Sequence, residues 1–257
     1  MRLQGKVAVI TGAGRGIGYA AAAAFAREGA KVVIAEIHDG LGRAAESRLR
    51  AEGGDATFIR TDCSLGGDVR RLMTETEARY GALHVLYNNA ALFLPKADGP
   101  VTDLAEDVWA RILAVNLTGT YLCCKHALPL IVRSGGGAVI NTGSSAAVIG
   151  APGCDAYTAT KGAVVALTRS MAVEYGRQGV RVNCICPAGI ETEMVKASSL
   201  DDPAFDREYF FRKAPLGRLG TPAKVAALAV FLASDEASYI SGAIIRADGA
   251  TTITPIA

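Results

Sequence analysis

The sequence predicts an α/β fold in which a mostly parallel sheet is wound on both faces by helices. Short apolar runs alternate with helical stretches along the whole chain, and the first such run ends in a glycine-rich loop. Continuous apolar strands separated by helices are typical of a parallel sheet covered on both faces. The 257 residues are half hydrophobic, which is enough for one sizeable core. We therefore expect a single domain over residues 1–257, of the doubly wound Rossmann type with about seven strands.

The first part of the chain reads as three strand–helix pairs and a fourth strand. Each strand is a short run rich in Val, Ile or Thr, and polar residues or glycines bound it. In order, we expect the strand Lys6–Thr11 and helix Gly16–Glu28, the strand Lys31–Glu36 and helix Leu41–Glu52, the strand Ala56–Thr61 and helix Val69–Tyr80, and the strand Val85–Asn88.

The second part continues this alternation with longer helices. In order, we expect the helical region Thr102–Val132, the strand Ala138–Thr142, the helix Tyr157–Tyr175, the strand Val180–Cys186, the helix Pro222–Leu232 and the short strand Ala243–Arg246. The irregular stretch near residues 191–220 combines mixed charge, aromatic residues and two prolines. Such a stretch inside a compact fold is typical of a functional loop, and we expect a substrate lid there.

Composition limits the class of protein. The net charge of +2 gives no footprint for nucleic acid or anionic membranes, and no apolar run is long enough to span a bilayer. No signal peptide precedes the first strand, so we expect a cytoplasmic protein. Six scattered cysteines form no CxxC pair and three histidines form no HExxH. We expect buried free thiols in a reducing cytosol and no metal site.

The loop between the first strand and the first helix carries the spacing TGxxxGxG, with glycines at Gly12, Gly16 and Gly18. Ile17 stands where the third glycine of the commoner GxGxxG would fall. Glycines allow a tight turn and a close approach to a pyrophosphate, and the helix N-terminus offers free N–H groups. The strand–loop–helix context favours dinucleotide binding over a simple packing turn.

Glu36 ends the second strand, where an acid can accept hydrogen bonds from both hydroxyls of an adenine ribose. The same acid would repel a 2′-phosphate, so we expect NAD rather than NADP. Arg15 favours the opposite choice, NADP, because its side chain could reach a phosphate. Glu36 is given more weight because its neighbours in sequence, Ala35, Ile37 and His38, include no arginine.

Tyr157 and Lys161 are four residues apart in a predicted helix, so their side chains share one face. An ammonium beside a phenol is expected to lower the phenol's pKa, because the phenolate gains a neighbouring positive charge. A tyrosine tuned in this way can exchange a proton with a substrate oxygen. Together with the glycine loop, the pair indicates an enzyme that handles a substrate alcohol or ketone.

In these features the chain resembles the short-chain dehydrogenase/reductases over essentially its whole length. The shared segments, in this order, are Thr11–Gly18, Asn88–Ala91, Asn116, Ser144, Tyr157–Lys161, Pro187–Thr192 and the tail from Ile240 to Gly249. The resemblance implies cofactor contacts from Gly12, Arg15, Gly16, Ile17, Gly18, Glu36, Asp62, Cys63, Asn89, Ala90, Tyr157, Lys161, Pro187, Ile190 and Thr192.

The resemblance also implies a catalytic set. Tyr157 would take the hydroxyl proton as the hydride leaves the substrate, and Lys161 would hold Tyr157 partly ionised. Ser144, thirteen residues before Tyr157, would hydrogen-bond the substrate oxygen. Asn116 would kink its helix and hold a water that links Lys161 to solvent.

Some positions depart from the common family pattern. Gly143 stands where a serine is frequent, and Ala91, Ala188 and Ala250 each stand where a glycine is frequent. None of these changes removes a functional group, so we interpret them as changes in packing.

The expected substrate is a hydrophobic or alicyclic secondary alcohol or ketone. The predicted pocket wall is mostly apolar and the lid adds aromatic residues; the positions are Leu92, Phe93, Leu94, Ala146, Val148, Cys154, Ala188, Met194, Phe205, Tyr209, Phe210 and Phe211. Two alternatives stay open. One is an NADPH-dependent reductase of 3-oxoacyl thioesters on a carrier protein, and the other is a non-catalytic nucleotide-binding protein. The family resemblance implies a homotetramer.

Overall fold

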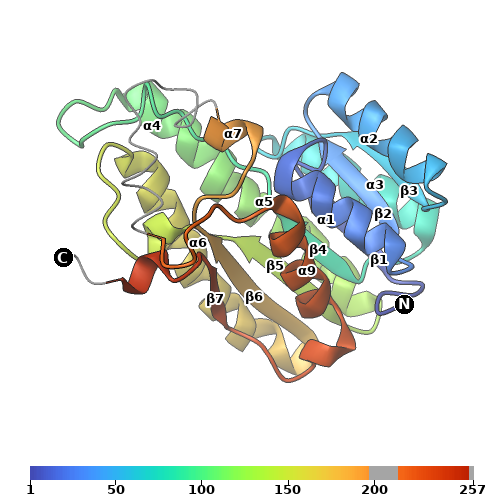
Figure 1. The fold of residues 1–257 in the computed structure, drawn as a ribbon. Coiled ribbons are helices and arrows are strands. Elements are labelled where there is room, and N and C mark those ends of the chain that lie inside the picture. The colour runs from blue at the N-terminus through green and yellow to red at the C-terminus, as the bar shows by residue number, and fades with distance from the viewer. Residues whose placement is uncertain (197–213, 255–257) are drawn as a thin grey trace.

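A seven-stranded parallel sheet forms the centre of the computed structural model, which describes residues 1–196 and 214–254. The strands are β1 (Val7–Thr11), β2 (Lys31–Glu36), β3 (Ala56–Arg60), β4 (Val85–Asn88), β5 (Gly137–Thr142), β6 (Val180–Pro187) and β7 (Ile244–Ala247). They lie in the order β3-β2-β1-β4-β5-β6-β7, and each neighbouring pair is parallel (Figure 1). The predicted doubly wound α/β fold is confirmed.

Helices cover both faces of this sheet (Figure 1). The main helices are α1 (Gly16–Arg27), α2 (Asp39–Ala51), α3 (Gly66–Tyr80), α4 (Glu106–Leu113), α5 (Gly119–Arg133), α6 (Asp155–Tyr175) and α9 (Pro222–Ala233). A three-residue helix, α7 (Glu193–Val195), follows β6. The expected lid falls partly outside the described residues, and so do its four aromatic side chains, Phe205, Tyr209, Phe210 and Phe211.

The largest difference from the sequence prediction lies in the region expected to be one helix over 102–132. The chain forms α4, then a π-helix over Ala114–Thr118, and then α5. Asn116 is buried inside the π-helix and hydrogen-bonds both backbone groups of Leu92 with its side chain. A π-bulge inside a helix is common at functional sites, and here it carries a predicted catalytic residue.

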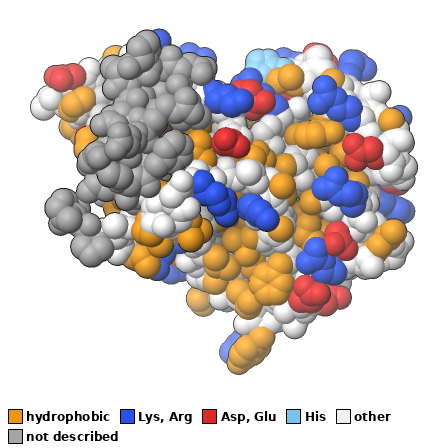
Figure 2. All heavy atoms as spheres, in the orientation of Figure 1, with side chains coloured by type: hydrophobic (Ala, Val, Ile, Leu, Met, Phe, Trp, Pro, Cys, Tyr) orange, Lys and Arg blue, Asp and Glu red, His pale blue; other side chains and the backbone are white. Residues whose placement is uncertain are grey.

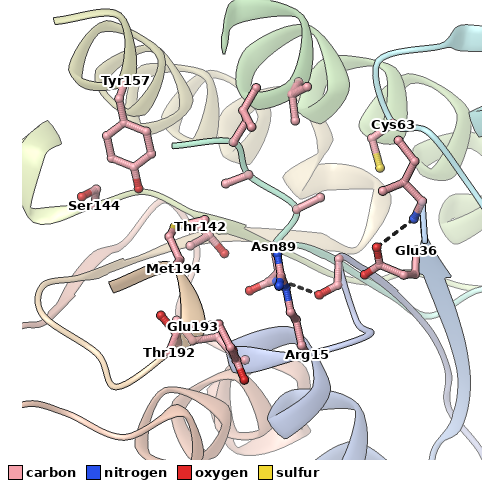
Figure 3. A pocket seen from close by; sticks show the side chains of 18 of the residues that line it. Arg15, Glu36, Cys63, Asn89, Thr142, Ser144, Tyr157, Thr192, Glu193 and Met194 are labelled. Atoms are coloured by element: carbon pink, nitrogen blue, oxygen red, sulfur yellow. Dashed lines mark hydrogen bonds between the residues drawn. The ribbon is translucent and has the colours of Figure 1, made fainter. Parts of the chain in front are cut away.

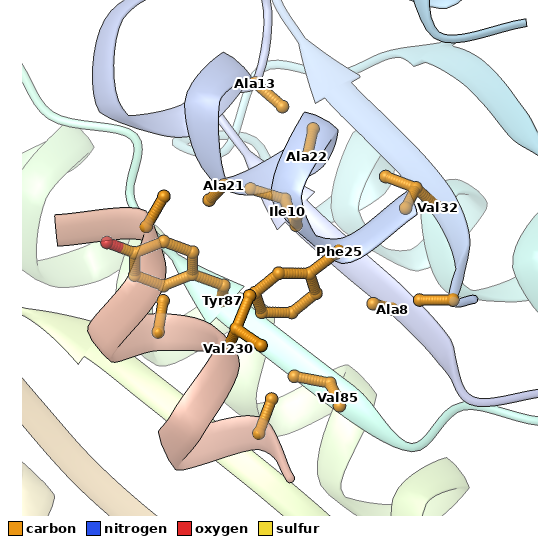
Figure 4. Close-up of a cluster of buried hydrophobic side chains, with 14 of the residues drawn as sticks. Ala8, Ile10, Ala13, Ala21, Ala22, Phe25, Val32, Val85, Tyr87 and Val230 are labelled. Atoms are coloured by element: carbon orange, nitrogen blue, oxygen red, sulfur yellow. The ribbon is translucent and has the colours of Figure 1, made fainter. Parts of the chain in front are cut away.

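Two apolar layers lie on opposite faces of the sheet because strand side chains alternate in direction. Ala8 and Ile10 of β1 pack into the layer beneath α1, α2 and α9. Val7 and Val9 of the same strand pack into the layer that includes residues of α3, α5 and α6. Figure 4 shows the first layer, in which Phe25, Tyr87 and Val230 meet over the sheet.

On the face shown in Figure 2, acidic and basic side chains are interspersed rather than gathered by sign, in keeping with the small net charge. Among the described residues, no helix combines the length and apolar character needed to cross a membrane. All six cysteines are buried and unpaired.

The strand order places a crevice at the carboxyl ends of the central strands. β1 lies between β2 and β4, so the chain winds away from β1 in both directions. In open α/β sheets, ligands bind in the crevice at the carboxyl ends of the strands beside such a point. The glycine loop after β1 and the segment after β4 meet there.

Candidate active site

A cavity of about 570 Å³ lies at the carboxyl ends of the strands. Its lining includes nearly every residue predicted to bind cofactor or act in catalysis: Gly12, Arg15, Gly16, Ile17, Glu36, Asp62, Cys63, Asn89, Ala90, Ser144, Tyr157, Lys161, Pro187, Ile190 and Thr192. Glu36 and Tyr157 lie at opposite ends of the close-up in Figure 3. Two predicted residues, Gly18 and Asn116, are not part of the lining.

Gly18 lies in the first turn of α1 and packs against the backbone of Gly12. A Cβ at this position would collide with the carbonyl oxygen of Gly12, so only glycine lets α1 begin this close to the end of β1. Asn89, which directly follows β4, fixes the same loop, because its side-chain amide donates to the carbonyl oxygen of Thr11 at 3.0 Å and to that of Gly12 at 3.2 Å. Figure 3 shows Asn89 beside the loop. The loop is therefore held rigidly at the mouth of the crevice.

Glu36 is only 6% exposed, and its carboxylate is fixed by backbone donors. Its Oε1 accepts from the N–H groups of Ile37 and His38, and its Oε2 accepts from that of Gly14 at 3.1 Å. Sequence neighbours had suggested that no arginine is close. However, Arg60 of β3 is the strand partner of Glu36, and its guanidinium pairs with Asp39 at 3.5 Å.

Tyr157 enters the cavity from the first turn of α6, and Ser144 approaches from the end of β5 (Figure 3). Burial raises the pKa of the Tyr157 phenol to about 12, although the neighbouring Ser144 hydroxyl acts to lower it. The ring of Phe93 packs against Tyr157 with 4.8 Å between ring centroids. Serine and phenol oxygens thus share one end of the cavity, where a substrate oxygen could hydrogen-bond to both.

Lys161 is 2% exposed, and its Nζ donates to the carbonyl oxygen of Thr142 at 2.8 Å. Its Nζ lies 5.5 Å from the centroid of the Tyr157 ring. Burial lowers the pKa of Lys161 to about 8. The prediction that the pKa of Tyr157 lies below its ordinary value is wrong, because desolvation of the phenol dominates and raises that pKa.

Asn116 lies behind the cavity wall and is 1% exposed. Its Oδ1 accepts from the N–H of Leu92 at 2.7 Å, and its Nδ2 donates to the carbonyl oxygen of Leu92 and to Thr160 Oγ1. Thr160 in turn donates to the carbonyl oxygen of Tyr157. The side chain therefore ties the segment after β4 to the helix that carries Tyr157.

Two of the departures from the common family pattern have structural causes that the sequence interpretation missed. A Cβ at Gly143 would lie 2.6 Å from Cys186 Sγ and 3.0 Å from Cys184 Sγ, so the two thiols of β6 occupy the space that a serine would need. Ala250 has φ +70°, the only positive φ of a non-glycine residue in the part of the chain that the structure describes. The change from glycine to Ala250 therefore strains the backbone rather than altering packing.

The apolar wall is smaller than predicted. Leu92, Ala188 and Met194 line the cavity, whereas five other predicted positions do not: Phe93, Leu94, Ala146, Val148 and Cys154. Sequence reasoning missed several polar contributors. Thr142 anchors Lys161, and Arg111 and Glu193 add charges to the lining. Arg111 follows no glycine or strand end, so no signal in the sequence singled it out.

The residues present fit a dinucleotide. The loop Gly12–Gly18 brings the backbone and the N-terminus of α1 to the cavity, and Glu36 presents a buried carboxylate in the same space. Asp62 and Asn89 line the wall beside them. Among residues 1–196 and 214–254, no group of three or more His, Cys, Asp and Glu side chains has the geometry to hold a metal ion.

A crevice that fits a dinucleotide and carries a Tyr–Lys pair at one end defines the class of nicotinamide-dependent oxidoreductases. A family model described as enoyl-(acyl carrier protein) reductase matches residues 12–252. The chain belongs to the short-chain dehydrogenase/reductase family and is an enzyme of the type that acts on CH–OH groups with a nicotinamide cofactor.

Individual relatives cover nearly the whole chain. The 2,5-dichloro-2,5-cyclohexadiene-1,4-diol dehydrogenase of Sphingobium indicum is 38% identical over 97% of this chain and 98% of its own length. The cis-4-hydroxycyclohexanecarboxylate dehydrogenase of Sinomonas cyclohexanicum is 40% identical over 96% of both chains. The crystal structure of levodione reductase has a TM-score of 0.93 at 32% identity, covering 99% of this chain and all of that one.

Proposed function

We propose that the protein is an NAD-dependent dehydrogenase that interconverts a hydrophobic or alicyclic secondary alcohol and its ketone. The observation that carries this proposal is the placement of Tyr157 and Ser144 at one end of a cavity whose other end contains the buried carboxylate of Glu36. Leu92, Ala188 and Met194 give the reacting end an apolar lining. Two relatives whose names specify alcohols on a six-membered carbon ring, a cyclohexadiene diol and a hydroxycyclohexanecarboxylate, support the alicyclic class.

In the proposed reaction, the nicotinamide supplies the hydride acceptor when it is bound. In alcohol oxidation Tyr157 acts as the phenolate, whose oxygen takes the proton from the substrate hydroxyl and so becomes the neutral phenol, while Ser144 Oγ donates a hydrogen bond to the substrate oxygen. Lys161, held by the carbonyl oxygen of Thr142, places a positive charge beside the phenol as it ionises. In the reverse direction, Tyr157 gives its proton to the ketone oxygen.

Asn116 has a proposed role outside direct contact with the reactants. Its side chain is engaged by Leu92 and Thr160, which supports a role in holding Tyr157 and the segment after β4 in place. The relay of protons from Lys161 to solvent through a water at Asn116 remains a prediction from the family resemblance.

The choice of NAD rests on charge at the ribose end. Glu36 is fixed by three backbone donors, so it cannot turn away to admit a 2′-phosphate without leaving those donors unpaired. Arg60 is engaged with Asp39, which reduces its availability for a phosphate. We propose NAD as the cofactor, a cytoplasmic location, and one domain over residues 1–257.

The proposed homotetramer is supported by exposed apolar side chains on three helices. Trp109 of α4, Tyr121 of α5 and Val173 of α6 are large hydrophobic residues that lie on the surface of the isolated chain. Contacts between copies would remove such side chains from water.

Reduction of a 3-oxoacyl thioester with NADPH is the second candidate. The family model that matches the chain carries the description enoyl-(acyl carrier protein) reductase. In addition, Arg15 lines the cofactor cavity. This candidate needs recognition of a 2′-phosphate beside the carboxylate of Glu36, which weakens it. A third candidate, nucleotide binding without catalysis, would leave the arrangement of Ser144, Tyr157 and Lys161 without a use.

A substrate panel with both cofactors tests the proposal. Meso-2,3-butanediol, cyclohexanol and cis-4-hydroxycyclohexanecarboxylate are offered with NAD or NADP, and acetoacetyl thioester is offered with NADH or NADPH. We expect reduction of NAD by the cyclic alcohols, followed as absorbance of the reduced nicotinamide, with at least about tenfold preference over NADP. Turnover of only the thioester with NADPH would support the second candidate. Cofactor binding without any turnover would support the third.

A further inference from the structure

Asp98 lies in the segment between β4 and α4, far from Tyr157 in sequence, yet it contacts the backbone of Tyr157 directly. Its Oδ2 accepts from the N–H of Tyr157 at 2.9 Å, and its Oδ1 accepts from that of Ala156 at 3.1 Å. A third bond comes from the N–H of Gly99 at 2.9 Å. The carboxylate is only 6% exposed, and these backbone donors compensate for its burial.

The first turn of α6 receives its hydrogen-bond acceptors from this distant segment. The first N–H groups of a helix have no partner within the helix. The thiol of Cys154, at the N-cap position, caps none of the backbone N–H groups of the first turn, and it contacts the carbonyl oxygen of Ala151 and the hydroxyl of Thr158 instead. Instead, Asp155 donates to the carbonyl oxygen of Gly99, and Asp98 accepts the next two N–H groups.

The contact is reciprocal and extends along the segment. The N–H of Val101 donates to Asp155 Oδ2, so the first residue of α6 also accepts a hydrogen bond from the segment after β4. At the other end of the segment, Leu92 is held by Asn116, and Phe93 packs on the ring of Tyr157. The segment from Leu92 to Val101 therefore contacts the backbone and the ring of Tyr157 and the first turn of α6.

We propose that Asp98 is a positioning residue for catalysis, which sets the place of the Tyr157 phenol by capping α6 across the fold. This inference rests on the proposed function, in which Tyr157 exchanges the substrate proton. Tyr157 is the third residue of α6, so a frayed first turn would move the phenol relative to Ser144 and Lys161. The adenine end of the cavity is built by other segments and would be unaffected.

Three variants separate the parts of this role. Asp98→Ala removes both acceptors from the helix. Asp98→Asn keeps one acceptor and loses the charge, and Asp98→Glu keeps the carboxylate on a longer side chain. A buried valine of α9, Val230, supplies the control, because Val230→Ala weakens the core without touching this segment.

Hydrogen exchange followed by mass spectrometry tests the cap without needing any activity. In Asp98→Ala, the peptide containing Ala156 and Tyr157 should exchange at least about tenfold faster than in the wild-type protein. In Val230→Ala, compared at equal distance below its own Tm, this peptide should be unchanged. Unchanged exchange in Asp98→Ala would overturn the proposal.

Kinetics with NAD and the best alcohol of the panel test the consequence. Asp98→Ala should lower kcat by about 10²-fold with the dissociation constant for NAD within about twofold of wild type, since misplacement of a reacting group acts on the chemical step. The kcat of Asp98→Asn should lie between the values for the wild type and Asp98→Ala. Asp98→Glu should recover part of the kcat that Asp98→Ala loses. An equal loss of kcat in Val230→Ala, or wild-type kcat in Asp98→Ala, would overturn the positioning role. Absence of turnover by the wild-type protein would instead contradict the proposed function, and the exchange measurement would still decide whether Asp98 caps α6.

Discussion

Replacement of Tyr157 by phenylalanine is expected to lower kcat for alcohol oxidation by about 10²–10⁴-fold, the usual contribution of a positioned acid or base. The ring would still pack against Phe93, but the oxygen that accepts the substrate proton would be gone. The dissociation constant for NAD should change little, because Glu36 and the glycine loop lie at the other end of the cavity. Steady-state kinetics and calorimetric titration with NAD measure the two quantities.

Tyr239 offers a matched control for this variant. Its side chain is fully exposed, so Tyr239→Phe removes a phenolic oxygen without disturbing the cavity. We expect wild-type kcat from this control. A Tyr157→Phe protein that retains more than about a tenth of wild-type kcat would show that another group transfers the proton.

Replacement of Lys161 by methionine is expected to separate activity from stability. The change removes the charge beside the phenol, and kcat should fall by about 10²-fold or more. It also removes a cation whose pKa is lowered to about 8 by burial, from an ordinary value of 10.5. Between these two values, the unfolded chain binds a proton that the folded chain has released, so the free energy of unfolding of the wild type rises with pH.

The methionine variant lacks this pH dependence. The stability of the wild type relative to Lys161→Met should therefore increase by about 2 kcal/mol between pH 8 and pH 10, from the linkage of one proton over this range. Above pH 10 the difference should level off, because the lysine of the unfolded chain then also loses its proton, around its ordinary pKa of 10.5. Urea unfolding at each pH measures the difference. Lys224→Met, at an exposed lysine, should show the same dependence of unfolding free energy on pH as the wild type. If Lys161→Met also shows the wild-type pH dependence, the explanation by a buried charge is contradicted.

The fold was predictable from the sequence because its signals are local. Strands such as Val180–Pro187 consist mainly of apolar residues, and their alternation with helices predicts a parallel sheet. The π-helix over Ala114–Thr118 was not predictable in this form, since it depends on hydrogen bonds between Asn116 and Leu92 across the fold. The early start of α6 at Asp155 has the same kind of cause, because its cap comes from Asp98.

The site was predictable where chemistry and spacing coincide, as in Tyr157 and Lys161. Its tuning was not, because burial decides the pKa values and cannot be judged from residue types alone. Arg60 escaped notice because it is next to Glu36 only across two strands. Likewise, the reason for Gly143 lies in two thiols of another strand, Cys184 and Cys186.

The most direct test of the central claim is the transfer of deuterium from the substrate to the cofactor. Cyclohexanol and meso-2,3-butanediol labelled with deuterium at the carbinol carbon are incubated with the wild-type protein and unlabelled NAD, and the reduced cofactor is analysed by mass spectrometry. We predict one deuterium on the nicotinamide ring of each NADH formed, and formation of labelled NADH at least about 10²-fold slower with Tyr157→Phe. NADH that forms without the label, or labelled NADH that forms equally well with Tyr157→Phe, would contradict a reaction in which Tyr157 takes the proton while the carbinol hydride passes to the nicotinamide.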